Sequence, residues 1–284
     1  MWGPTVVSKD LGHFSKVSAF ALVVALAGCS KDPFNNLELD NFTAAQIYEQ
    51  AELSLAKGDA ETAARYFGEV ERIYPYSEWG KRALVMQAFA YHRDGDYDAA
   101  RGAAQRFVAF YPADEDAAYA QYLLALSYYD QIDDVGRDQG LILNALKELT
   151  AVIENYPRSE YARSAELKFD LAYDLLASKE MEVGRYYLKR GNYTAAINRF
   201  RVVVKDFQTT AHTAEALHRL VEAYLALGLR DEAQTAAAIL GHNYAGSDWY
   251  QDSHALLTGQ GLRPEGKAGG WLGNIWGGLV SVNE

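Results

Sequence analysis

The sequence is poor in the residue types that build covalent cross-links and metal sites. It has one cysteine among 284 residues, so there is no second thiol for a disulfide or a cysteine-based zinc site. Its six histidines include no His-x-x-x-His pair, and no glycine-rich phosphate-binding loop follows a strand-like run. We therefore predict no metal, no cofactor and no enzymatic activity. The many carboxylates are typical of the solvated faces of amphipathic helices.

Basic residues and long apolar runs are also scarce. The 27 Lys and Arg residues are outnumbered by 38 Asp and Glu, which gives a formal net charge of −11. This acidic balance argues against a nucleic-acid partner and against a chain that lies flat on anionic lipid. The apolar run at Val17–Ala27 suits the core of a signal peptide and is too short to span a bilayer.

The only cysteine directly follows that apolar run. Leu26–Cys29 reads Leu-Ala-Gly-Cys and resembles the bacterial lipoprotein signal. The resemblance implies that residues 1–28 are a signal peptide and that Cys29 is acylated, with 29–42 as a lipid-anchored tether. Ser30, rather than aspartate, after the cysteine favours the outer membrane of a Gram-negative bacterium, with the protein facing the periplasm. A buried cysteine behind an ordinary helix is the alternative.

Five segments of the chain repeat one spacing. In each, an alanine stands five residues after a glycine, and an aromatic residue, usually followed by proline, stands 16 residues after that glycine. The glycines are Gly58, Gly95, Gly140, Gly191 and Gly228. The alanines are Ala63, Ala100, Ala145, Ala196 and Ala233. The aromatic residues are Tyr74, Tyr111, Tyr156, Phe207 and Tyr244. Apolar residues also recur four and seven positions after each alanine, which is the stripe of an amphipathic helix.

The same marks predict where helices begin and end. Each glycine should end one helix, because a residue without Cβ can turn the chain, and each aromatic–proline pair should end the next. Ser77 and Ser159 are typical N-caps of the helices that follow. The segment from Ser159 to Arg190 predicts one long helix, interrupted only by Gly184.

These features resemble the tetratricopeptide repeat, a helix–turn–helix unit. The resemblance covers 43–245 and predicts an all-α fold, an α-solenoid of five tetratricopeptide-like helix pairs with a groove for extended peptides. Residues 246–284 break the pattern and include the glycine-rich "GGWLGNIWGGLV". We predict that this tail is disordered; the alternative is a short adhesive segment that a partner orders.

Four stretches resemble one family in their order and spacing: "AQIYEQAELSLAKGDAETA", "ERIYPYSEW", "VGRYYLKRGNYTAAINRF" and "VVKDF". The family is the outer-membrane lipoprotein BamD, also called ComL, and the resemblance covers about 43–240. It implies a non-catalytic scaffold of the β-barrel assembly machinery, working with the barrel subunit BamA and other lipoproteins. In that family the C-terminal repeats dock on the POTRA domains of BamA. The N-terminal groove receives the β-signals of unfolded outer-membrane proteins.

The resemblance also implies particular site residues. The arginine of the BamA-docking surface falls in "AINRF" at Arg199, with Asn198 beside it and Tyr187 on the preceding helix. A guanidinium there could pair bidentately with a carboxylate of the partner.

The client groove of the family maps onto the first repeats. Tyr74 and Arg106 match its substrate-contacting region, and Tyr76 adds an aromatic residue outside the repeat core. The family has a second basic residue three places after Arg106, but this chain has Ala109, which weakens the positive charge offered to an anionic peptide. Tyr74 is also a repeat-core residue, so packing is an alternative role for it.

A lipoprotein of a different function could share the same architecture. A tetratricopeptide lipoprotein that organises peptidoglycan or cell-envelope enzymes would have Cys29 and the helix pairs. It would not need the Arg199 surface or the lengthened fourth unit.

Overall fold

The computed structural model describes residues 39–133, 139–266 and 271–272, and in these the chain forms helices and connecting turns only. The chain divides into two units, Met1–Asn41 and Phe42–Glu284. The described residues of the first unit form a short 3₁₀ helix, Leu39–Asn41. The second unit contains the α-helices. These are α1 (Ala44–Ala56), α2 (Ala60–Ile73), α3 (Glu78–Asp94), α4 (Tyr97–Phe110), α5 (Ala117–Tyr129), α6 (Gln139–Asn155), α7 (Glu160–Lys189), α8 (Tyr193–Asp206), α9 (Thr213–Ala226), α10 (Arg230–Asn243) and α11 (Asp248–Thr258).

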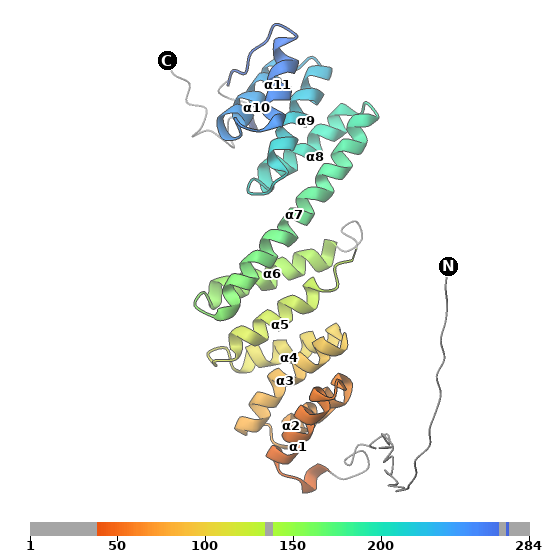
Figure 1. Ribbon diagram of the computed structural model, residues 1–284, viewed down its shortest axis with the longest axis vertical. Coiled ribbons are helices and arrows are strands. Elements are labelled where there is room, and N and C mark those ends of the chain that lie inside the picture. Colours follow the sequence, from red (N-terminus) through yellow and green to blue (C-terminus); the bar gives the residue numbers. More distant parts are fainter. Residues whose placement is uncertain (1–38, 134–138, 267–270, 273–284) are drawn as a thin grey trace, which may run out of the picture. The chain divides into compact units, whose positions relative to one another are not determined.

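The helices of the second unit pack in chain order, as Figure 1 shows. From α1 to α10, each helix packs against the next, and α1, α3, α5, α7 and α9 also contact one another in sequence. The first helix of each pair therefore lies against the first helix of the following pair, which is how tetratricopeptide repeats stack. This arrangement confirms the predicted all-α solenoid of five helix pairs.

The repeated alanines lie where paired helices touch. All five have fully buried side chains, and so have the apolar residues four and seven positions later. An alanine lets two helix backbones approach closely, while the larger residues fill the space on either side. The aromatic residue that closes each repeat caps the second helix of its pair. Its backbone N–H donates to the carbonyl of the residue four positions earlier.

The glycine prediction is correct in four repeats and wrong in one. Gly58, Gly95, Gly191 and Gly228 have φ values between 72° and 86°, where a residue with Cβ would be strained. Gly140 instead lies in the first turn of α6. The inserted residues before it already separate α5 from α6, so this glycine does not make the turn.

The two serine caps also differ. The Ser77 hydroxyl accepts a hydrogen bond from the backbone N–H of Gly80 at 2.9 Å, as predicted for an N-cap. Ser159 occupies the N-cap position of α7, but its side chain makes no capping hydrogen bond. The sequence "YPxSE" thus places both helix starts correctly and predicts the cap hydrogen bond at only one of them.

The predicted long helix is α7, a single helix of 30 residues with Gly184 inside it. A Cβ at Gly184 would lie 2.4 Å from Cε1 of Phe200, a fully buried ring of α8. The glycine therefore does not break the helix; it allows α8 to pack closely against it.

The prediction for 246–284 is wrong over its first part. Asp248–Thr258 form α11, which packs against α9 and α10, and Ser247 caps it by accepting from the N–H of Tyr250. The repeat spacing does not predict this helix, because the sequence of the helix lacks that spacing. Farther on, Leu272 is only 2% exposed and lies in the core of the last repeats. Residues 267–270 and 273–284 lie outside the described part of the chain.

Candidate functional site

The three residues of the predicted docking surface lie on two adjoining helices, α7 and α8. Asn198 and Arg199 are exposed on α8. Arg199 Nη1 lies 3.1 Å from Oε2 of Glu180 on α7, and the arginine side chain remains 45% exposed. Tyr187, two helical turns after Glu180, is partly buried against the core of the last repeats. Glu180 is not predicted from the sequence, because its position in the long helix carries no repeat mark.

A second aromatic residue stands beside this surface. The ring of Tyr186 is 51% exposed and meets Tyr187 edge to face, with centroids 5.7 Å apart. The guanidinium of Arg190 lies 4.4 Å from the centroid of the Tyr186 ring. This pair presents an exposed, cation-backed aromatic surface, which favours contact with another protein.

The predicted client residues have unequal settings. The hydroxyl of Tyr74 donates to the carbonyl oxygen of Phe42 at 2.6 Å, so this tyrosine ties the entry of α1 to the end of α2. Tyr76 is fully exposed, two residues farther along the same turn. The Phe42 contact gives the half-buried Tyr74 a packing role, and Tyr76 is the more exposed aromatic side chain of the two; the client role of both stays a prediction.

Arg106 connects three helices. Its Nη2 donates to Oε1 of Gln87 on α3 at 3.1 Å and lies 3.3 Å from Oε2 of Glu71 on α2. The side chain is still 47% exposed, while Gln87 is nearly buried. Ala109, where the resemblance implies a second basic residue, is exposed on the following turn. The arginine is thus held in place by groups of its own chain and partly neutralised by one of them.

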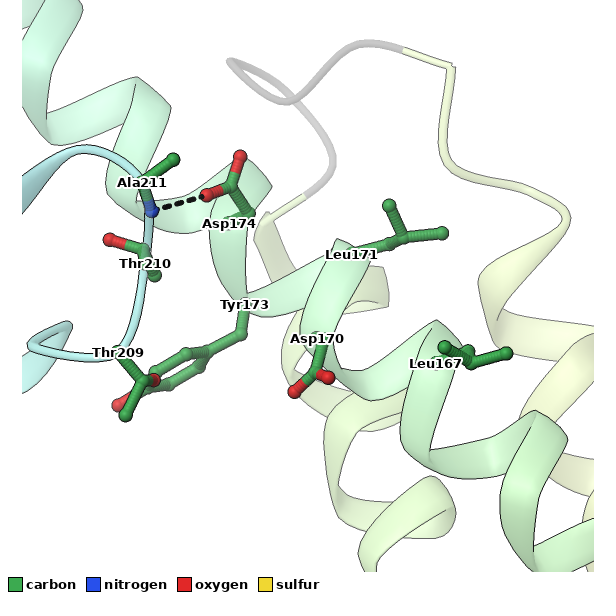
Figure 2. Close-up of a pocket in the computed structure, with 8 residues that line it drawn as sticks. All are labelled: Leu167, Asp170, Leu171, Tyr173, Asp174, Thr209, Thr210 and Ala211. Carbon is green, nitrogen blue, oxygen red and sulfur yellow. Dashed lines mark hydrogen bonds between the residues drawn. The ribbon is translucent and has the colours of Figure 1, made fainter.

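A pocket of about 580 Å³ lies along α7, beside the turn that leads into α9. Its lining residues are Leu167, Asp170, Leu171, Tyr173, Asp174, Thr209, Thr210 and Ala211. Figure 2 shows Asp174 turned toward the turn, where it accepts from the backbone N–H of Ala211 at 3.4 Å, with Leu167 and Leu171 farther along the helix. No sequence motif predicts this pocket, because its lining residues come from two stretches some 40 positions apart.

The side chain of Trp271 packs against the last repeats. Trp271 Nε1 donates to the hydroxyl of Tyr224 at 2.9 Å, and the guanidinium of Arg201 lies 4.1 Å from the centroid of the indole ring. Burial raises the pKa of the Tyr224 hydroxyl above its usual range. Trp271 therefore has a specific binding site within its own chain, formed by Tyr224 and Arg201.

The predicted signal peptide and lipidation site precede the first described residue, Leu39. Residues 1–28 and Cys29 lie outside the described part of the chain, so the signal peptide and the acylation stay predictions. Among the described residues, no helix is long and apolar enough to cross a membrane. Within those same ranges, no three His, Cys, Asp or Glu side chains gather in a way that could hold a metal ion.

The stacked helix pairs define a helical-repeat protein of the tetratricopeptide kind. The sequence pattern of the family YfiO, described as an outer membrane lipoprotein, matches residues 40–239. Outer membrane protein assembly factor BamD of Caulobacter vibrioides is 44% identical over 249 residues, covering 87% of this chain and 82% of that protein. The protein of the same name from Rickettsia prowazekii is 40% identical over 246 residues, covering 86% of this chain and 97% of that protein. The chain therefore belongs to the BamD family of outer membrane protein assembly factors.

Likeness to solved structures is weaker. TTC0263, a tetratricopeptide protein of Thermus thermophilus, has 19% sequence identity and a TM-score of 0.34 and covers 76% of this chain and 100% of that one. The fold described above rests on the helices and their contacts alone.

Proposed function

We propose that this chain is a non-catalytic scaffold of the β-barrel assembly machinery that helps outer-membrane β-barrel proteins to fold and insert. Membership of the BamD family supports the role, and the resemblance found in the sequence supplies the partners. The chain would be held at the outer membrane by lipid on Cys29 and would face the periplasm.

The observation that carries the docking half of this proposal is the Arg199–Glu180 pair. Arg199 is exposed, on the helix pair that the resemblance assigns to the POTRA domains of a BamA-like subunit, and is oriented by a carboxylate of its own chain. A partner carboxylate could replace Glu180 or share the guanidinium, which has donors for both. Asn198 and the Tyr186–Tyr187 pair would add polar and aromatic contacts around this charge.

The client half rests on Tyr76 and Arg106. A β-signal is an extended peptide with aromatic residues, and the fully exposed Tyr76 and the positioned Arg106 offer an aromatic and a cationic contact to it. Because Glu71 already neutralises part of the Arg106 charge and Ala109 adds none, we expect weak binding. Weak binding suits a subunit that must release its clients to the barrel subunit.

The docking proposal is tested by co-purification from native outer membrane in mild detergent. Arg199→Asp would set a carboxylate against the partner's carboxylate, and we expect about tenfold less barrel subunit to accompany it. Arg163→Asp is the matched control: Arg163 is an exposed arginine of α7 whose ion pair, among the residues that the structure describes, is with Glu166, one turn away. Glu180→Gln removes the competing carboxylate and should leave co-purification intact or increase it.

Three results would contradict the proposal. The first is wild-type co-purification by Arg199→Asp, and the second is equal loss in Arg163→Asp. The third is a wild-type preparation that contains peptidoglycan enzymes and no barrel subunit, which would favour the other class of tetratricopeptide lipoprotein.

A further inference from the structure

One face of α7 combines exposed leucines with carboxylates. Leu167, Asp170, Leu171 and Asp174 fall at positions i, i+3, i+4 and i+7 and therefore share one side of the helix. The leucines are 49% and 59% exposed, although this is the middle of a helix that packs against its neighbours on other sides. These two leucines are about half exposed, lie one helical turn apart and line a pocket. Such an arrangement favours a contact with another chain.

The pocket has a fixed wall opposite the helix. The hydroxyl of Tyr173 donates to the carbonyl of Asp206 at the end of α8. Asp174 accepts from Ala211 N–H and lies 3.3 Å from Nε2 of His212, which holds the Thr209–Ala211 turn against α7. These contacts make a preformed surface, so an incoming segment would not have to order it.

The charge of the pocket indicates what can occupy it. Its lining includes two carboxylates and no lysine or arginine. Asp174 is engaged by the turn, whereas Asp170 is exposed and makes no ion pair within the part of the chain that the structure describes. A ligand that covers the leucines must therefore come close to an unneutralised carboxylate.

We propose that this pocket is a docking site for a short amphipathic helix of a partner protein. That helix would place two apolar side chains, one turn apart, over Leu167 and Leu171. A lysine or arginine on the flanking turn would face Asp170 (Figure 2). The surface is separate from Arg199 and from the client residues, and the proposal does not depend on either of them.

The test places a photo-crosslinking amino acid at Leu171 of the full chain in its native outer membrane. Cross-linked peptides are then sequenced by mass spectrometry. We expect one dominant peptide that is positively charged and has apolar residues three or four positions apart. Adding Asp170→Lys should lower its yield about fivefold, since an attraction is replaced by a repulsion at a half-exposed site.

Matched positions show whether the pocket itself is responsible. Leu143 of α6 is a leucine of equal exposure outside the pocket, and the same crosslinker there should not capture this peptide. Glu182→Lys changes an exposed charge of α7 outside the pocket and should leave the yield at Leu171 unchanged. In a chain that carries both the crosslinker at position 171 and Arg199→Asp, the crosslink should persist. This result would separate the pocket from the docking surface proposed above.

Four outcomes would overturn the inference. The first is a crosslink at position 171 no stronger than at position 143. The second is a captured peptide that is acidic or lacks the apolar spacing. The third is a peptide from a second copy of this chain. The fourth is a yield that does not respond to Asp170→Lys.

Discussion

The last repeats and the middle of the chain are packed differently. From α7 to α11, together with Leu272, the buried residues form one continuous cluster. Around α6 and the first half of α7, together with Ala125 of α5, there are two small clusters. One contains Ala125, Leu149, Val152 and Ala165, and the other contains Ile142, Leu146 and Ala172. The middle also has the exposed leucines Leu143, Leu167 and Leu171. The difference teaches that the C-terminal repeats gather their buried apolar residues into one core, whereas the middle divides its core and leaves its leucines more exposed than those of the last repeats.

Matched leucine truncations test this comparison most strongly. Leu217 in the C-terminal cluster and Leu149 in the middle are both fully buried. We expect Leu217→Ala to cost about 4 kcal/mol of unfolding free energy and Leu149→Ala about 3 kcal/mol, because half-buried tyrosines around Leu149 can move into the cavity. Urea unfolding followed by circular dichroism measures both. Equal costs would mean that the two regions are packed equally well.

A glycine substitution tests the tight contact between α7 and α8. In Gly184→Ala the new Cβ would overlap the buried Phe200 ring, so we expect a loss of about 2 kcal/mol of stability. Gly102→Ala is the control, since nothing lies within 4 Å of a Cβ at that exposed position of α4. In Gly102→Ala the higher helix propensity of alanine should raise the unfolding free energy by about 0.5–1 kcal/mol. If Gly184→Ala were neutral in the same unfolding experiment, the contact would be looser than described.

Acid should lower the stability of the N-terminal repeats more than that of the last repeats. We expect this effect to be smaller than those of the substitutions above. Asp114 lies in the turn between α4 and α5, and Lys81 Nζ lies 2.8 Å from it. The hydrogen bond from Lys81 lowers the pKa of Asp114 below its usual value. The stabilisation is therefore present above about pH 4, the unfolded value, and is lost as the pH falls through the lower folded value. The equivalent residue between α8 and α9 is Thr210, whose neutral hydroxyl donates to the carbonyl of Phe207.

Asp114→Asn is the variant that checks this pH dependence. The urea midpoint of the wild type should fall more between pH 7 and pH 3 than that of the variant. Burial raises the pKa of Asp116, which opposes the effect and keeps it small. An identical fall in both proteins would show that the Lys81–Asp114 pair does not stabilise the fold.

The repeat spacing predicts most of this fold because each mark has a local physical cause. Positive φ at Gly58 and complete burial at Ala63 depend on neighbours within one helix pair, and that information recurs in five copies. Gly140 shows the limit: an insertion changes the geometry around a residue while leaving its spacing to the following repeat intact. The repeat spacing does not predict α11, because a single helix at the end of the array has no copy with which to align it.

The candidate sites are less predictable from sequence. Arg199 and Arg106 could be located by resemblance, but their carboxylate partners Glu180 and Glu71 come from other helices and carry no motif. Tyr74 has a position that favours recognition, yet its hydroxyl serves the chain itself through Phe42. Side-chain pairing between helices depends on how the repeats stack, which a one-dimensional spacing does not record.

The length of α7 also bears on how the molecule unfolds. Repeat arrays commonly gain and lose their units one after another, because each unit contacts only its neighbours. Here one helix supplies Ala165 and Ala172 to the two small clusters and Met181 to the large one. Breaking it anywhere withdraws packing from repeats on both sides, so α7 should make the melting of the central and final repeats a single cooperative event.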